Sequence, residues 1–163
     1  MVTIRTAKIV DVPEIVELWK EFMLDTRKII AKTDMKLSRY DELNSHGPSL
    51  FKKFAVETIR DRNGLVLVAE EHGRLVGYSL SYIKKNIIVY KLAKLGHVSD
   101  LFVKKNYRRQ RIGSRFKTRI FSWFASKGIK HASLNVSPAN PNAYKAYLKW
   151  GFETYCLEMR RKL

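Results

Sequence analysis

The spacing of apolar residues divides the first third of the chain into a short strand and two helices. Thr3–Thr6 is typical of a short strand. From Val12 onward, apolar residues recur every three or four positions, which predicts an amphipathic helix that ends near Ile30. Lys32–Ser49 is polar and loses this period, so we expect a loop or a broken helix there, followed by a second helix over Leu50–Arg60.

The middle of the chain has the pattern of strands joined by hairpins. After the turn signal Asn63-Gly64, the compact apolar run Leu65–Glu71 predicts a buried strand. His72-Gly73 is a hairpin turn, and Leu75–Ile83 is the returning strand. Two further segments favour β-structure, and the first of them could prolong that hairpin: Asn86–Leu95 and Gly96–Lys104.

The last third alternates helices and strands. Apolar residues from Ile112 to Phe124 mark a helix that stops at Gly128, and a strand is expected over Ile129–Val136. A helix over Pro141–Trp150 stops at Gly151, and Phe152–Arg160 is predicted as a final strand. The order β-α-α-β-β-β-α-β-α-β predicts one α/β (α+β) domain over residues 1–163, with antiparallel pairing early and a parallel element late.

Charge is the unusual property of the composition. The chain has 32 lysine and arginine residues against 15 acids, a formal net charge of +17. Such a charge favours an anionic partner, and nucleic acid, a ribosome, an anionic membrane surface and a phosphorylated cofactor all qualify. The basic residues are spread along the chain, which disfavours a disordered basic arm.

The remaining bulk properties indicate an ordinary cytoplasmic protein. A chain of 163 residues suits a single core, and one cysteine, Cys156, excludes an internal disulfide. No apolar run approaches the roughly 20 residues of a membrane span. We therefore expect no membrane partner and no metal.

Two segments carry candidate chemistry. In His97–Arg115 a strand runs into an arginine-rich loop that opens a helix. Unpaired N–H groups at a helix start, the small residues Gly113 and Ser114, and three arginines together suit a pyrophosphate. In Asn135–Phe152 a strand ends in a turn at Asn140 and a helix follows with Tyr147 on it. Taken alone, the first segment is also compatible with a solvated face at a helix start, and Tyr147 is first of all compatible with a packed helix aromatic.

Together the two segments resemble the GNAT superfamily of N-acetyltransferases. That family has the cofactor motif [Gln/Arg]-x-x-Gly-x-[Gly/Ala], often introduced by Tyr-Arg, and here Tyr107-Arg108 introduces Arg108-x-x-Arg111-x-Gly113. Its later motif Asn-x-x-Ala-x-x-x-Tyr-x-Lys-x-Gly-Phe is complete: Asn140, Ala143, Tyr147, Lys149, Gly151 and Phe152. The order of elements is similar too, so the resemblance implies a mixed, mostly antiparallel sheet with a parallel splayed strand pair, flanked by helices.

The chain departs from the first motif at Arg111, where the family has glycine. Glycine allows a positive φ or a close approach of a ligand to the backbone. An arginine reaches the left-handed region only at a cost of about 1–2 kcal/mol. Two alternatives are open: the loop stays in ordinary φ space, or Arg111 contributes its charge to the phosphates.

The resemblance implies acetyl-CoA as co-substrate and a primary amine as acceptor. Pantetheine would lie between the strands ending at Val103 and Val136, on the backbone of Leu101, Phe102 and Val103. The remaining cofactor contacts implied are Arg108, Arg109, Gln110, Arg111, Ile112, Gly113, Ser114, Asn140 and Tyr147.

Two proton transfers complete the implied reaction. Tyr147 matches the family's general acid for the leaving thiolate. Asp100 is the candidate base, as the one acid on the central strand near the splay, and His97 could relay the proton through water. The alternatives are a strand-end carboxylate that binds backbone and a structural histidine.

The acceptor is not identified by the sequence. The resemblance points to Trp19–Ser49 and Lys84–Leu95, where Asp25, Asp34, Asp41 and Glu42 could receive the amine of a protein N-terminus, a lysine, a polyamine or a small amine. A solvated loop is the simpler explanation for these acids. A homodimer is left open, and so is a different class of function, a basic RNA- or ribosome-binding module on the same scaffold with weak or lost catalysis.

Overall fold

The computed structural model describes residues 1–162, apart from the side chain of Ser38. Its longer elements are, in chain order, β1 (Thr3–Thr6), α1 (Val12–Thr33), α2 (Met35–Ser38), α3 (Gly47–Arg60), β2 (Gly64–Glu71), β3 (Arg74–Lys85), β4 (Lys94–Val103), α4 (Ile112–Ser126), β5 (Ala132–Leu134) and α5 (Pro141–Lys149). Three short 3-10 turns complete them: η1 (Ile9–Asp11), η2 (Arg39–Asp41) and η3 (Lys105–Tyr107).

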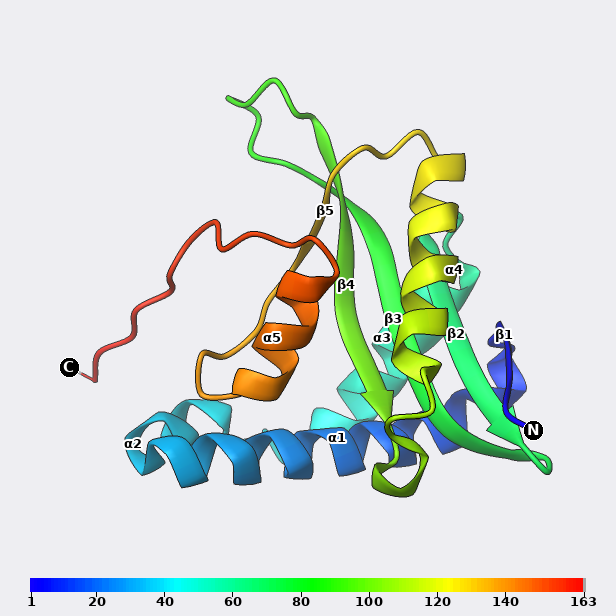
Figure 1. The fold of residues 1–163 in the computed structure, drawn as a ribbon, viewed down its shortest axis with the longest axis horizontal. Helices are drawn as coiled ribbons and strands as arrows, with labels where there is room; N and C mark the ends of the chain where they lie inside the picture. The colour runs from blue at the N-terminus through cyan, green and yellow to red at the C-terminus, as the bar shows by residue number, and fades with distance from the viewer. Residues whose placement is uncertain (163) are drawn as a thin grey trace.

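The strands form a single mixed sheet in the order β1-β2-β3-β4-β5. The first four pair antiparallel with their neighbours, and β5 pairs parallel with β4 (Figure 1). The predicted fold class, a mostly antiparallel sheet with one parallel pair flanked by helices, is confirmed.

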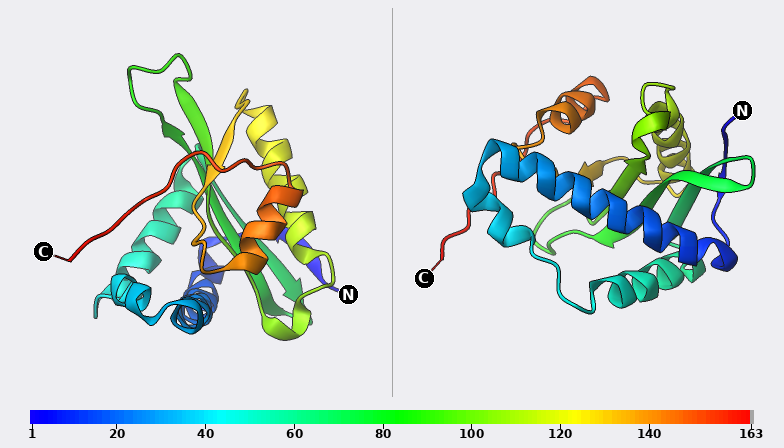
Figure 2. Two further views of the ribbon diagram at one scale, coloured as in Figure 1. Left: turned by 60° about the vertical axis from the view of Figure 1, so that its left-hand side comes forward. Right: turned by 90° about the horizontal axis from the view of Figure 1, so that it is seen from below.

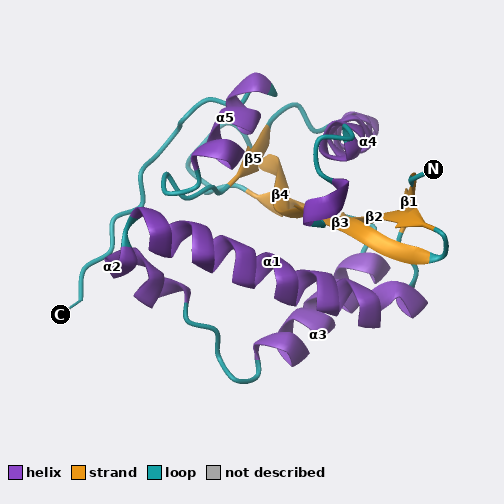
Figure 3. Cartoon of the chain, turned by 60° about the horizontal axis from the view of Figure 1, so that its bottom comes forward, coloured by secondary structure: helices purple, strands orange, loops and turns teal. Residues whose placement is uncertain are grey.

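Helices α1 and α3 cover one face of the sheet, while α4 and α5 lie on the other (Figure 3). The helical period of α1 buries Val12, Ile15 and Trp19, as the sequence predicts. Trp19 stacks on Phe51 of α3 with ring centroids 4.7 Å apart. The segment between the two helices contains α2 and η2, so it is the broken helix that was one of the expectations.

The opposite face carries a second core under α4. Phe116, Ile120 and Phe124 of that helix are buried against β-strand side chains. A Cβ on Gly96 would lie 2.6 Å from the ring of Phe124, so α4 can cross β4 this closely only over a glycine.

The hairpins follow the predicted turns, with one difference. His72 and Gly73 have φ of 50° and 73°, as the tight turn between β2 and β3 requires. Strand β3 continues to Lys85 and β4 begins at Lys94, so most of the predicted β-rich extension Asn86–Leu95 is a loop.

The C-terminal strand prediction is wrong. Residues 152–162 have no strand, and in Figures 1 and 2 this segment runs away from the sheet. The predicted strand Ile129–Val136 shortens to the three residues of β5, which offers little edge for another strand to pair with. Tyr155, Leu157 and Met159 alternate as in a strand but stay exposed, because alternation without a ladder partner does not form a sheet.

Among residues 1–162, no helix combines the length and the apolar character that crossing a bilayer requires.

Candidate active site at the opening between β4 and β5

Strands β4 and β5 part soon after they meet. Their ladder is confined to Gly96–Val98 against Ala132–Leu134, and beyond Leu134 the chain bends away toward α5 (Figure 1). Residues 99–103 of β4 therefore keep an edge that no strand covers. The predicted backbone contacts Leu101, Phe102 and Val103 lie on this edge.

A β-bulge turns the side chains of β4 at this point. Leu80 pairs with Asp100 and Ser81 with Val98, which leaves Ser99 as the extra residue. Along a regular strand, His97 and Asp100 would point to opposite faces. The bulge places both on the face covered by α1 and α3.

Asp100 is held by two hydroxyl groups. Tyr78 Oη donates a hydrogen bond of 2.8 Å to Asp100 Oδ2, and Ser99 Oγ donates one of 3.1 Å to Oδ1. Burial raises the pKa of Asp100 above its usual value, while these two hydrogen bonds act in the opposite direction. A carboxylate with a raised pKa is a stronger base than an ordinary aspartate, which suits deprotonation of an amine.

Tyr78 was not among the residues singled out from the sequence. It is fully buried on β3, and burial together with the charge of Asp100 holds its pKa well above the usual value, so it stays a hydrogen-bond donor. A signal existed in principle, because a polar-tipped aromatic in an apolar strand needs a buried partner. Identifying Asp100 as that partner requires the position of the bulge.

His97 has a different environment. It is 6% exposed, and its Nδ1 lies 3.0 Å from Ser133 Oγ on β5. Burial, with a smaller effect of Lys84, lowers its pKa to about 4. The imidazole is therefore neutral at pH 7 and a weak proton acceptor, and its contact with Ser133 joins the two parallel strands.

Tyr147 is a residue of α5. Its ring packs against Trp150 and Phe152, with centroid distances of 5.4 and 6.1 Å. Burial raises its pKa, and the negative charge of Asp100 raises it further, so the phenol keeps its proton at neutral pH. Asn140 caps the same helix, since its Oδ1 accepts a 3.3 Å hydrogen bond from the N–H of Ala143.

The arginine-rich loop lies at the far end of β4 and leads into α4. Arg108 binds within the protein: its Nε donates to Val103 O at 2.9 Å, and its Nη2 lies 2.5 Å from Asp25 Oδ2 on α1. These contacts anchor the loop to β4 and α1. Gln110 reaches back to Asn106 O at 3.5 Å.

Arg109 and Arg111 are the residues that present free charge. Both adopt the left-handed conformation, with φ of 67° and 60°, so the loop does not stay in ordinary φ space. Within residues 1–162 neither guanidinium has a hydrogen-bond or ion-pair partner, and both side chains are exposed. Arg111 is the N-cap of α4 and gives no side-chain cap.

The first turn of α4 is open to a ligand. Ile112 is buried beneath it, while Ser114 is exposed. Gly113 has an ordinary φ, and a Cβ on it would come no closer than 3.8 Å to Leu101 and Trp150. The fold itself therefore does not require a glycine there, whereas close approach of an anion to the helix N–H groups would.

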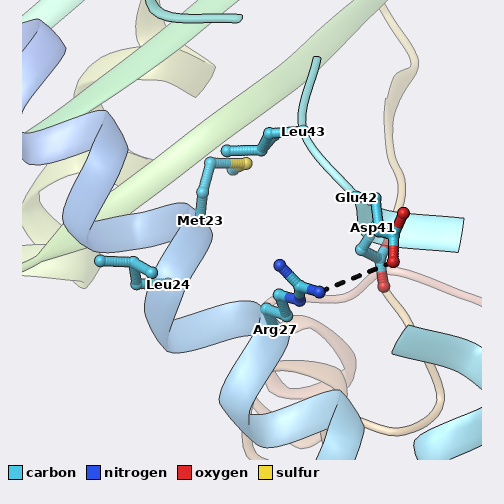
Figure 4. Close-up of a pocket in the computed structure, with 6 residues that line it drawn as sticks. All are labelled: Met23, Leu24, Arg27, Asp41, Glu42 and Leu43. Carbon is cyan, nitrogen blue, oxygen red and sulfur yellow. Dashed lines mark ion pairs between the residues drawn. The ribbon is translucent and has the colours of Figure 1, made fainter. Parts of the chain in front are cut away.

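The four acids considered for the acceptor separate into two groups. Asp25 forms an ion pair with Arg108. Asp34 caps α2, since its Oδ1 accepts a hydrogen bond of 2.8 Å from the backbone N–H of Lys36. Asp41 and Glu42 instead line a cavity of about 280 Å³ between α1 and the segment that follows α2 (Figure 4). Its other lining residues are Met23, Leu24, Arg27 and Leu43, and Arg27 lies 3.9 Å from Glu42.

Among residues 1–162, His, Cys, Asp and Glu side chains form no cluster of three that could hold a metal.

The chain matches a known family over most of its length. The model of the acetyltransferase (GNAT) family matches residues 16–152. A comparison with curated protein sequences finds no match.

Solved structures of similar fold cover almost the whole chain. A tetramutant of the BH1408 protein from Bacillus halodurans superposes with a TM-score of 0.79 at 21% identity, covering 99% of both chains. A predicted acetyltransferase from Clostridium acetobutylicum, crystallised with acetyl-CoA, gives 0.77 at 18% identity and covers 98% of this chain and 96% of its own. AAC(6')-Iy, in complex with the bisubstrate analogue CoA-S-monomethyl-acetylneamine, gives 0.74 at 14% identity, with 100% and 99% covered.

Proposed function

This chain belongs to the GNAT acetyltransferase family, and from that premise we propose that it transfers an acetyl group from acetyl-CoA to a primary amine, with both substrates bound together. The observation that carries the proposal is the opening beside β4. Asp100 belongs to β4 at this opening, and its charge raises the pKa of Tyr147 on α5, which supports their acting at one site.

The cofactor would be held by two parts of the chain. The uncovered edge of β4 at residues 99–103 offers backbone groups for the amides of pantetheine. The start of α4, with Gly113 and the free guanidinium groups of Arg109 and Arg111, suits the pyrophosphate. Arg108 would act by fixing the loop, since its own donors are engaged with Asp25 and Val103.

Bound acetyl-CoA would supply a thioester carbon open to attack and a thiolate leaving group. Asp100 would take one proton from the ammonium group of the acceptor, and the neutral amine so formed would attack the thioester carbon. As the C–N bond forms and the C–S bond breaks, Tyr147 would give its proton to the sulfur, and the second proton lost by the nitrogen would restore the phenol. The raised pKa of Asp100 favours the first transfer, and the raised pKa of Tyr147 ensures that the phenol is protonated beforehand. His97 is better suited to holding β4 against β5 than to accepting a proton.

For the acceptor, the cavity of Figure 4 is the best candidate surface. Two carboxylates, Asp41 and Glu42, line it against one cationic group, Arg27, so the lining carries a net negative charge in a chain that is otherwise strongly basic. This suits an acceptor with a second cationic group. A polyamine, a lysine peptide or an aminoglycoside, the class bound by the analogue in AAC(6')-Iy, has this property. The nucleic-acid-binding alternative gains no support from the matched family or these structures.

The test has two parts. Acetyl-CoA at 100 times its Kd should stabilise the fold by about 2.7 kcal/mol, and a chain of this size gains about 2–4 °C in Tm per kcal/mol. No change in Tm at millimolar acetyl-CoA would contradict cofactor binding. A panel of protein N-terminal peptides, lysine peptides, polyamines and aminoglycosides, scored by thiol release, would then identify the acceptor, and no release with any amine would contradict the transfer.

A further inference from the structure

The loop between β3 and β4 carries an apolar tip on a projecting hairpin. In Figure 1 this green hairpin extends beyond the rest of the molecule, and it does so again in the left view of Figure 2. Its tip is the run Ile87, Ile88, Val89 and Tyr90, which are 63%, 96%, 78% and 51% exposed. Single exposed apolar residues are ordinary, but four in succession mark an interaction site.

The apolar tip (residues 87–90) is a closed turn. Tyr90 N donates to Ile87 O at 3.0 Å across it. At its base Asn86 donates twice, from its backbone N to Ala93 O and from its Nδ2 to Leu92 O, both at 2.9 Å. The backbone is thus hydrogen-bonded within the turn, and the apolar side chains face outward.

Lysines surround this tip. Lys84 and Lys85 lie at the end of β3, Lys91 follows the tip in the loop, and Lys94 begins β4. No acid occurs between positions 84 and 95. In the part of the chain that the structure describes, none of the four makes an ion pair. We refer to these four residues as the lysine collar.

We propose that the apolar tip inserts into the interface of an anionic lipid bilayer, with the lysine collar on the phospholipid head groups. Aliphatic side chains gain from leaving water, a tyrosine is favoured at head-group level, and lysines are attracted to the negative surface. Such peripheral docking needs no spanning helix. The proposal differs from the sequence-based expectation of no membrane partner, which rests on the absence of a membrane-spanning run.

The position of the tip leaves the cofactor site free. The hairpin lies at the Lys94 end of β4, while the Arg108–Gly113 loop lies at its Val103 end (Figure 1). A molecule docked by the tip would therefore direct the arginine-rich loop away from the bilayer. This inference is independent of the proposed acetyl transfer, and either can fail alone.

Two other partners fit the tip less well. A second copy would bring two lysine collars together on chains that each carry +17, which opposes self-association there. A nucleic acid would use the lysines but leave the aliphatic tip in water, since Tyr90 alone could stack on a base.

Vesicle flotation with the full chain tests the proposal. The wild-type protein should bind phosphatidylcholine vesicles that contain phosphatidylserine, and bind pure phosphatidylcholine vesicles far less. The double substitution Ile88→Ser with Val89→Ser should weaken binding about tenfold or more. Val10→Ser, at a residue outside the tip that is 79% exposed, is the matched control and should bind as wild type. Lys91→Gln with Lys94→Gln should remove the preference for phosphatidylserine.

A label reports insertion directly and does not depend on the stability of the tip variants. In a Cys156→Ser background, Ile88→Cys carrying an environment-sensitive fluorophore should shift to the blue on anionic vesicles, whereas Val10→Cys should not. Binding of the double serine variant equal to wild type, or an unshifted label at position 88, would overturn the proposal. The proposal would also be overturned if the protein formed a dimer, or a complex with single-stranded RNA, and the tip substitutions abolished that complex but left vesicle binding intact.

Discussion

Tyr147 combines a packed ring with a hydroxyl group that has no hydrogen-bond partner within residues 1–162. Its ring contacts Trp150 and Phe152, which phenylalanine would preserve. Tyr147→Phe should therefore leave Tm nearly unchanged and lower kcat about 10²-fold, with little change in Kd for acetyl-CoA. Steady-state kinetics and a cofactor titration measure these quantities.

The matched control lies on the same helix. Tyr144 shares a hydrogen bond of 2.7 Å with Thr154 Oγ1 and is not part of the opening. Tyr144→Phe should retain kcat. Equal losses in the two variants would assign both to the stability of α5 and remove Tyr147 from the role of general acid.

Tyr78 acts through Asp100 as a positioning residue. Its hydrogen bond favours the charged carboxylate, so Tyr78→Phe should raise the pKa of Asp100 further. A base must be deprotonated to act, and the acid limb of the kcat/KM profile should therefore move to higher pH. The pH–rate profile of the variant measures this shift.

Tyr82→Phe provides the comparison. Tyr82 faces the same side of the sheet and feels the charge of Asp100, but it makes no hydrogen bond to that carboxylate. Its substitution should leave the acid limb in place. A loss of rate in Tyr78→Phe without any displacement of the limb would show that Tyr78 supports the core alone.

At the scale of elements, the arginine-rich loop allows the two alternatives for Arg111 to be separated. Its φ of 60° shows that Arg111 takes the left-handed conformation, which glycine adopts without strain. Arg111→Gly should relieve strain of about 1–2 kcal/mol, partly offset by the entropy of glycine, and should raise Tm. If Arg111 contributes charge to the phosphates, the same variant binds coenzyme A more weakly.

Calorimetry of the variant with coenzyme A and with pantetheine, which has no phosphate, separates the two effects. A loss of affinity for coenzyme A but not for pantetheine supports a contact between the charge of Arg111 and the phosphates. Arg111→Asn, which tolerates the left-handed region without the charge, is the control and should lose the same affinity. Unchanged affinity in both variants would assign the pyrophosphate to backbone groups and Arg109.

The elements also show what sequence patterns can and cannot determine. The helical period of α1 and the turn at His72-Gly73 depend on local sequence, and both were predicted. The joint orientation of His97 and Asp100 depends on the bulge at Ser99, which is set by pairing with β3 and has no local signature. The false strand Phe152–Arg160 has the same cause, because its alternation was correct and its partner edge was absent.

At the scale of the whole molecule, two groups of unpaired basic residues lie far apart, and each suits an anionic ligand. The lysine collar lies at one end of β4 and the free arginines at the other. Local ion pairs do not neutralise either group, so each keeps its field for a ligand. The acidic cavity with Asp41 and Glu42 is then the exception that an amine acceptor would recognise.

The net charge of +17 should also control how fast the cofactor arrives. Raising the salt concentration from about 0.1 M to about 1 M shortens the screening length from about 10 Å to about 3 Å. The association rate of acetyl-CoA should then fall about tenfold, whereas kcat at saturating cofactor should change little, because Asp100 and Tyr147 are half-buried and less screened by salt than the exposed arginines. Stopped-flow binding measures the rate, and uncharged S-acetylpantetheine is the control. An equal salt dependence for that uncharged analogue would show that screening acts on the fold instead of on steering, since an analogue without phosphates has no charge for the arginine-rich loop to attract.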